Sequence, residues 1–194
     1  NYDSYCRFGL NSVPGHFLQM GFMIAARGCP FKCKFCSDPN RRGNYRRRPL
    51  DNIIDEIKWQ KRHWHVEGIV FKDDLFYHND SWITTFCNRV IEENINLKYY
   101  AQIRPELVGS LETLLLMRKA GFVQLALGVE SGSQRVLDLI DKGTTVEQIA
   151  DSIEKMKRAK IDSFAYMILG IPGETADDLE KTVAFLKRTR PTFT

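Results

Sequence analysis

The sequence predicts an α/β protein built on a parallel sheet, and three observations lead to this prediction. Short apolar runs alternate with segments of helical periodicity, which is typical of successive strand–helix units. Capping residues mark the ends of several helical segments. The chain has 194 residues, fewer than the roughly 250 of a complete eight-unit barrel. We therefore expect a partial (β/α) barrel of about five to six units, with a doubly wound sheet as the alternative.

Five apolar runs are the expected strands. Each is short and is bounded by polar or turn residues, which is typical of strands buried on both faces of a parallel sheet. The run FVQLALGV is the most continuous of them. The expected strands cover residues 17–26, 68–71, 98–103, 122–129 and 163–169.

Six segments with helical patterns fill the intervals between and after these strands. In the first segment the isoleucines recur at helical spacing. Ser110 and Gly121 flank the third helix as a cap at each end, and Thr145 with Gln148 forms a capping box in the fifth. Thr175 opens the last helix. The expected helices cover residues 50–63, 81–93, 111–120, 133–141, 145–160 and 175–188.

The composition restricts the class of protein. Hydrophobic residues make up 43% and charged residues 27% of the chain, which excludes a disordered protein. No apolar run approaches the roughly 18 residues of a membrane span. The net charge of +4 is too small to indicate a nucleic-acid partner by itself. Five arginines gather between Arg41 and Arg48, and we favour a solvated loop there over a binding site for a polyanion.

The chain divides into a short lead-in and one core. Residues 1–16 carry no pattern of a strand or helix, and we interpret them as a lead-in or linker from a preceding domain. Residues 17–194 form the expected core, which we expect to stop before the last strand of its sheet. The chain does not begin with Met, so we interpret it as a fragment of a longer protein.

Three of the five cysteines, Cys29, Cys33 and Cys36, lie in a C-x3-C-x2-C pattern, whereas Cys6 and Cys87 are isolated. An odd and clustered set of cysteines argues against a disulfide framework and suits a reducing compartment. Soft thiolates select zinc, cuprous copper or iron–sulfur clusters. A closed zinc site needs a fourth ligand, and no second C-x2-C pair is present. Three thiolates would leave one iron of a cubane open to another ligand.

Polar residues and glycines follow the other expected strands. Asp73 and Asp74 come after the second strand, Arg104 after the third, Glu130 after the fourth and Gly170 after the fifth. Because the carboxyl ends of parallel strands meet at one edge, we expect these residues to converge with the cysteines on one site. The alternatives are that the carboxylates cap helices or lie in solvent, and that the glycine only forms a turn.

The cysteine pattern, with Phe35 just before its last cysteine, resembles the radical S-adenosylmethionine (radical SAM) superfamily. Three further runs, EGIVFKDDLFYHND, ALGVESGSQRVLDLIDKGTTVEQI and FAYMILGIPGETADDLEKTV, together with RGCPFKCKFCS, resemble one branch of it. That branch includes many cobalamin-binding radical SAM proteins and the methylthiotransferases. The resemblance covers about residues 17–190, nearly the whole chain.

The resemblance implies a cluster and a bound cofactor. Cys29, Cys33 and Cys36 would ligate three irons of a 4Fe–4S cluster, and the amino and carboxylate groups of SAM would chelate the fourth. Phe35 would lie against the adenine, with plain core packing as its alternative role. Gly170 and its neighbours would line the adenine on another side.

The resemblance also implies contacts with the charged parts of SAM. One of Asp73 and Asp74 would hold the ammonium group, and Glu130 would reach the ribose or the methionyl amine. Arg104 would pair with the carboxylate of SAM. These transfers rest on the family pattern and not on spacing alone.

The implied activity is reductive cleavage of SAM to methionine and a 5′-deoxyadenosyl radical, which abstracts a substrate hydrogen. It would take place in the cytoplasm, with a one-electron reductant such as flavodoxin or ferredoxin. Cobalamin-dependent methyl transfer or a related modification is one form of this activity, with a cobalamin-binding domain ahead of Asn1. Two alternatives remain: an RNA-modifying enzyme similar to methylthiotransferases, and a non-catalytic iron–sulfur or zinc module.

Overall fold

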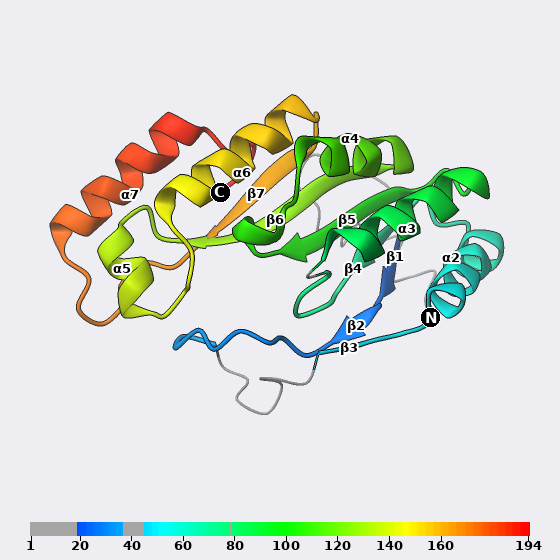
Figure 1. The fold of residues 1–194 in the computed structure, drawn as a ribbon, viewed down its shortest axis with the longest axis horizontal. Helices are drawn as coiled ribbons and strands as arrows, with labels where there is room; N and C mark the ends of the chain where they lie inside the picture. Colours follow the sequence, from blue (N-terminus) through cyan, green and yellow to red (C-terminus); the bar gives the residue numbers. More distant parts are fainter. Residues whose placement is uncertain (1–18, 37–44, 78) are drawn as a thin grey trace.

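A five-stranded parallel sheet forms the centre of the molecule in a computed structural model, which describes residues 19–36, 45–77 and 79–194 (Figure 1). The expected lead-in 1–16, Cys6, Arg41 and Arg42 lie outside the described residues. The strands of the sheet are β1 (Met20–Met23), β4 (Gly68–Phe71), β5 (Lys98–Ile103), β6 (Phe122–Glu130) and β7 (Asp162–Met167).

The strands lie in the sheet in the same order as in the chain, β1-β4-β5-β6-β7, and every neighbouring pair is parallel. A doubly wound sheet reverses its strand order at a switch point. No reversal occurs among the described strands, so the partial barrel is confirmed and the doubly wound alternative is wrong.

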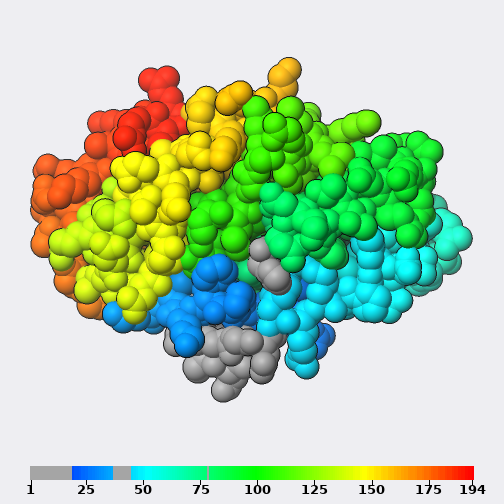
Figure 2. Space-filling view, viewed as in Figure 1, coloured from blue at the N-terminus to red at the C-terminus, as the bar shows by residue number. Residues whose placement is uncertain are grey.

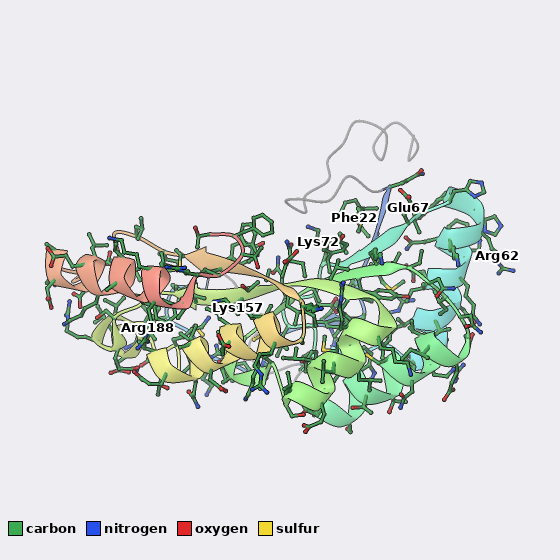
Figure 3. The ribbon with its side chains drawn as sticks, turned by 90° about the horizontal axis from the view of Figure 1, so that it is seen from above. Phe22, Arg62, Glu67, Lys72, Lys157 and Arg188 are labelled. Carbon is green, nitrogen blue, oxygen red and sulfur yellow. The ribbon has the colours of Figure 1, made fainter. Side chains whose placement is uncertain are left out.

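Helices follow the strands and form a layer that runs in chain order. α3 contacts α4, α4 contacts α6, and α6 contacts α7. Figure 3 shows α3, α4 and α6 on one side of the sheet, and Figure 2 shows the colours following the chain across the molecule. The helices are α2 (Leu50–Trp64), α3 (Asp80–Glu92), the 3-10 turn η1 (Pro105–Leu107), α4 (Leu111–Ala120), α5 (Gln134–Leu139), α6 (Val146–Arg158) and α7 (Ala176–Thr189).

Local sequence sets the ends of these helices. Ser110 accepts a hydrogen bond from the Thr113 amide at the start of α4, and Gly121 ends that helix with φ 114°. The capping box predicted at Thr145 is present in α6. α7 begins with a second box, in which Thr175 and Asp178 cap each other's backbone. These caps fix where each strand–helix unit begins.

The core lies between the sheet and the helix layer. Phe71, Phe76, Phe86, Tyr99 and Phe122 have no exposed surface and pack with ring centroids 4.3–6.3 Å apart. Burial of each aromatic side chain stabilises the fold by roughly 1.5–3 kcal/mol. This rigid block supports the strand ends that carry the polar residues.

The segment after β1 differs from the expected single strand. β1 ends at Met23, and a separate strand β2 (Ala26–Arg27) pairs antiparallel with β3 (Arg46–Arg47). Arg46 and Arg47 were expected in a loop. Asp73 accepts a hydrogen bond from the Ala26 amide, which ties β2 to the segment after β4. The chain therefore leaves the sheet before it reaches the cysteines.

The residues after α7 return to the sheet beside β7. The Phe193 amide donates to the Ser163 carbonyl at 2.9 Å, and the Ala165 amide donates to the Phe193 carbonyl at 2.8 Å. Phe193 and Phe164 thus form a parallel bridge on the edge of β7. Among the described residues, no helix is long and apolar enough to cross a membrane.

Candidate cluster and cofactor site

The cysteine loop begins directly after β2 and is docked against the far half of the chain. The Lys34 amide donates to the Ile140 carbonyl at 2.9 Å, and the Lys34 ammonium lies 3.0 Å from the Asp141 carboxylate. Both contacts are made at the end of α5. The loop thereby lies over the carboxyl ends of the central strands.

The predicted site residues converge on one cavity of about 250 Å³. Asp73 and Gly170 are the exceptions and do not line it. Strands β5, β6 and β7 supply its floor at their carboxyl ends. The lining comprises Cys29, Cys33, Phe35, Cys36, Asp74, Gln102, Ile103, Arg104, Ala126, Gly128, Glu130, Lys142 and Tyr166.

Arg104 connects the cysteine loop to the strands. Its side chain is 7% exposed, and its Nη1 lies 3.0 Å from the Cys33 sulfur. Its other nitrogens donate to the Lys142 carbonyl and the Glu106 carboxylate, and the guanidinium stacks 3.8 Å from the centre of the Phe31 ring. All three nitrogens thus have protein partners. The guanidinium thus ties the cysteine loop to the end of β5.

Glu130 sits in a strained backbone position at the end of β6. Its φ of 65° lies in the left-handed region, and the pairing of β6 with β7 shifts register at this point. The carboxylate lies 2.8 Å from the Lys142 ammonium, and both side chains are at most 8% exposed. Backbone strain of this kind is found at functional sites, where surrounding structure maintains it. The bulge directs a balanced pair of charges into the cavity.

The structure separates the two adjacent carboxylates after β4. Asp74 lines the cavity and accepts a hydrogen bond from the Gly28 amide at 3.1 Å. Asp73 is 3% exposed and accepts a hydrogen bond from the Ala26 amide instead. Burial raises the pKa of Asp73 to about 7, against the opposing effects of that hydrogen bond and of the Arg47 charge. Asp73 therefore has a structural position, and Asp74 is the carboxylate that faces the cysteines.

The remaining predicted residues take different positions. Phe35 lines the cavity with a side chain that is 40% exposed, and the Lys142 ammonium lies 5.4 Å from its ring. Gly170 lies away from the cavity with φ 79°, and its amide donates to the Glu174 carboxylate at 2.7 Å. Gly173 is also in the left-handed region. The GIPGE run forms a turn, and Arg135 donates to its Gly173 carbonyl at 2.8 Å.

The sulfur environment fits an iron–sulfur cluster. Cys29, Cys33 and Cys36 form no disulfide and line the same cavity. Burial raises the pKa of the Cys29 thiol, while a backbone hydrogen bond from Phe31 and the Arg104 charge lower it. In the described part of the chain, no three His, Cys, Asp or Glu side chains are gathered as ligands of a single ion. In a 4Fe–4S cubane each thiolate binds a different iron. Such a cluster therefore suits three sulfurs that line one cavity without surrounding a single ion position.

Comparison with protein-family models identifies the domain. Residues 23–186 match the model of the radical SAM superfamily, which is most of the chain and includes all three clustered cysteines. The chain belongs to the radical SAM superfamily. This confirms the resemblance drawn from the cysteine loop and the strand ends, and radical SAM proteins use a 4Fe–4S cluster and SAM.

Two relatives show which branch this radical SAM domain resembles. It is 27% identical to an uncharacterized methyltransferase of Pyrococcus horikoshii, over 95% of this chain and 40% of that protein. It is 31% identical to the anaerobic magnesium-protoporphyrin IX monomethyl ester cyclase of Rubrivivax gelatinosus, over 86% of this chain and 30% of that protein. Methylthiotransferases of tRNA and of ribosomal protein uS12 are also relatives. The chain thus spans well under half the length of the methyltransferase and of the cyclase.

A solved structure shares the fold of this radical SAM domain. The radical SAM methyltransferase TsrM from Kitasatospora setae, solved with cobalamin and a [4Fe-4S] cluster bound, superposes with a TM-score of 0.80. The identity is 18%, over 91% of this chain and 36% of TsrM. The likeness confirms the partial barrel.

Sequence reasoning missed three polar residues that line the site, namely Gln102, Lys142 and Tyr166. Gln102 is a polar residue in an apolar strand, which was a usable signal, and it lies 3.4 Å from the Tyr166 hydroxyl. Lys142 follows a short helix and resembles an ordinary surface lysine in the sequence. Only the fold brings it to Glu130.

Proposed function

We propose that this radical SAM domain binds a 4Fe–4S cluster through Cys29, Cys33 and Cys36 and cleaves SAM in the cavity beside them. The observation that carries the proposal is the convergence of three thiols with charges of both signs at the carboxyl ends of the strands. SAM has an ammonium and a carboxylate, so a site with both acidic and basic side chains is complementary to it.

When bound and reduced, the cluster supplies the electron that divides SAM into methionine and a 5′-deoxyadenosyl radical. Asp74 accepts hydrogen bonds from the SAM ammonium. Glu130 accepts hydrogen bonds from the ribose, and Lys142 holds its carboxylate in place. Arg104 positions Cys33 and would also pair with the SAM carboxylate, because the described contacts use three of its five N–H donors. Phe35 covers the adenine and helps to exclude water.

The whole protein, we further propose, modifies its substrate by a cobalamin-dependent methyl transfer or a related radical reaction. The names of the methyltransferase and cyclase relatives support this class of reaction. We propose that the protein is cytoplasmic, since the four cysteines that the structure describes are all outside disulfides. Flavodoxin or ferredoxin would supply the electron that reduces the cluster. The core would be preceded by a lead-in at residues 1–16.

Adding SAM to the reduced, cluster-containing protein tests the proposal. We expect the electron paramagnetic resonance spectrum of the cluster to change, because SAM in this cavity would lie beside the cluster. We also expect 5′-deoxyadenosine to form with a strong reductant. A spectrum that SAM leaves unchanged, with no 5′-deoxyadenosine, would support the non-catalytic module instead.

A further inference from the structure

A second cavity lies on the other side of the segment that leads into the cysteine loop. Its volume is about 830 Å³, compared with about 250 Å³ for the cysteine cavity. The end of β1, the β2–β3 pair and the residue after β4 form its walls. Its lining residues are Phe22, Met23, Ile24, Ala26, Arg27, Arg46, Arg47, Arg48, Glu56 and Lys72.

The lining of this cavity has an excess of positive charge. Among its charged residues only Glu56 is acidic, and it pairs with Arg48 at 2.5 Å. Arg48 also donates to the Ile24 carbonyl at 3.0 Å, so it serves the local structure. No described acidic side chain forms an ion pair with Arg27, Arg46 or Lys72. The net charge that faces the cavity is therefore strongly positive.

Two of these cations face each other across the β2–β3 pair. Arg27 and Arg46 are register partners, so their side chains leave the ribbon on the same side. Like charges directly opposite in an antiparallel pair destabilise it. An oxyanion between the two guanidinium groups would remove this repulsion, because arginine binds carboxylate and phosphate in a bidentate manner. The register itself thus points to a negatively charged ligand.

Arg47 also lines the cavity, but its side chain leaves the β2–β3 pair on the face opposite to that of Arg46, because successive strand residues alternate. Its guanidinium stacks 3.6 Å from the centre of the Trp82 ring, and its Nη2 donates to the Phe76 carbonyl at 2.8 Å. Its Nη1 is buried and has no hydrogen-bond partner among the described residues. A buried donor without a partner costs about 1–3 kcal/mol. This arginine fixes the β2–β3 pair to the core and is not a ligand in the proposed anion site.

The remaining wall of the cavity is apolar. Phe22, Met23, Ile24 and Ala26 supply it, and the Lys72 ammonium lies 5.5 Å from the Phe22 ring. Figure 3 shows Phe22 and Lys72 beside each other, on the side of the sheet away from the helices. Aromatic and aliphatic surface next to cations fits a ligand with an apolar body and an acidic end.

The two cavities share the segments that separate them. After β2, Arg27 lines this basic cavity and Cys29 lines the cysteine cavity. After β4, Lys72 lines the basic cavity and Asp74 lines the cysteine cavity. Two residues of extended chain span at most about 7 Å. The backbone positions that line the two cavities are therefore within about 7 Å of one another in both segments.

We propose that this basic cavity anchors the carboxylate or phosphate group of an otherwise apolar substrate. Calling the bound molecule a substrate rests on the proposed cleavage of SAM. The binding of an anion in this cavity does not depend on that proposal. Arg27 and Arg46 hold the oxyanion, and Phe22 contacts the apolar body. The anchored molecule presents its remaining part to the cysteine cavity.

Calorimetric titration of the full-length protein without a reductant tests the proposal. The probes are 4-phenylbutyrate, phenyl phosphate and the uncharged 4-phenylbutyramide, at constant ionic strength. At least one of the two anions should bind tenfold or more tightly than the amide. Arg46→Gln should weaken binding of that anion about tenfold and leave the amide unchanged. Arg62→Gln removes the same charge at the outer end of α2 and should change none of the three affinities (Figure 3).

Thermal unfolding of the ligand-free protein provides a second measurement. Arg46→Gln should raise the melting temperature, because it removes the repulsion between Arg27 and Arg46. A merely structural arginine would lower it. Equal affinities for anion and amide, no binding of either anion, or equal losses in Arg46→Gln and Arg62→Gln would overturn the proposal. If the anion result holds and no 5′-deoxyadenosine forms, the proposed function fails and the anion site stands.

Discussion

Cys87 has the same thiol group as the loop cysteines but a different environment. It is fully buried in the hydrophobic core, and burial raises its pKa to about 12. A thiol that remains protonated is a poor metal ligand. Cys29, Cys33 and Cys36 instead line a cavity that also contains the charged side chains of Asp74, Arg104, Glu130 and Lys142.

This contrast predicts the iron content of four alanine variants. Cys29→Ala, Cys33→Ala and Cys36→Ala should each abolish cluster binding after anaerobic reconstitution, because two thiolates cannot hold the cubane. Cys87→Ala should retain full iron and sulfide and lose about 1 kcal/mol of stability. Iron and sulfide analysis measures the outcome. Equal iron loss in Cys87→Ala would contradict the assignment.

The two carboxylates after β4 should respond differently to the same substitution. Asp74→Asn should weaken SAM binding about tenfold or more, because a charge-assisted hydrogen bond is worth roughly 1.5–3 kcal/mol. Asp73→Asn is the matched control and should leave SAM affinity almost unchanged, since Asp73 does not line the cavity. Equilibrium binding of SAM to the cluster-containing protein measures both. The reverse order of effects would refute the placement of Asp74.

Asp73 should make stability depend on pH. Burial raises its folded-state pKa from 3.8 to about 7, and burial also lowers the pKa of Arg47 to about 10, so for both groups burial outweighs their mutual attraction. The folded state therefore binds the Asp73 proton more tightly than the unfolded state. Its contribution to stability is fully present below pH 3.8 and is lost as the pH rises to about 7.

Urea unfolding of the cluster-free protein at pH 5 and pH 7.5 measures this dependence. Relative to the wild type, Asp73→Asn should become more stable at the higher pH, by on the order of a few kcal/mol. The asparagine cannot ionise and so keeps the favourable neutral state. A difference between the two proteins that is the same at both pH values would show that Asp73 has an ordinary pKa.

At the scale of elements, the bulge that ends β6 determines the geometry of the site. Gly128 and Gly132 lie on either side of Glu130, and a side chain at each position would clash with different neighbours. A Cβ on Gly128 would lie 2.5 Å from the Glu130 carboxylate and 2.7 Å from the Lys142 ammonium. A Cβ on Gly132 would meet Thr182 and Phe185 of α7.

The two glycines should therefore give separable phenotypes when changed to alanine. Gly128→Ala should displace the Glu130–Lys142 pair and weaken SAM binding several-fold, while the cluster content stays unchanged. Gly132→Ala should push on α7 and lower the melting temperature, with little effect on SAM affinity of the folded protein. Thermal unfolding and SAM titration of both variants distinguish these effects. Loss of SAM affinity in Gly132→Ala alone would contradict this account.

The sequence predicted the elements well where the signals are local. The strand 98–103 and the helix 111–120 have the predicted bounds, because apolar runs and capping residues determine both. The β2–β3 pair was not predicted, since each strand has two residues and depends on a partner about 20 positions away. Lys142 was missed for the same reason: its role exists only through the fold. Local patterns cannot reveal such contacts.

At the scale of the whole molecule, strand order predicts where the sheet is most stable. β5 has a strand on each side, whereas β1 pairs only with β4 among the described strands. Native-state hydrogen exchange should be slowest in β5 and β6 and roughly tenfold or more faster in β1, because edge strands open locally. Peptide-resolved mass spectrometry measures this. Protection of β1 equal to that of β5 would show that further contacts cover the β1 edge.

The docking of the cysteine loop has a consequence for biosynthesis. Lys34 contacts Leu139, 105 residues later in the chain, and Ile140 and Asp141 beside it. At a translation rate of about 5–20 residues per second, the loop leaves the ribosome roughly 5–20 s before its docking partners exist. During that interval its thiols lack the contacts that dock the loop against α5. Synthesis from the N-terminus thus allows the cluster to be loaded before the site closes around it.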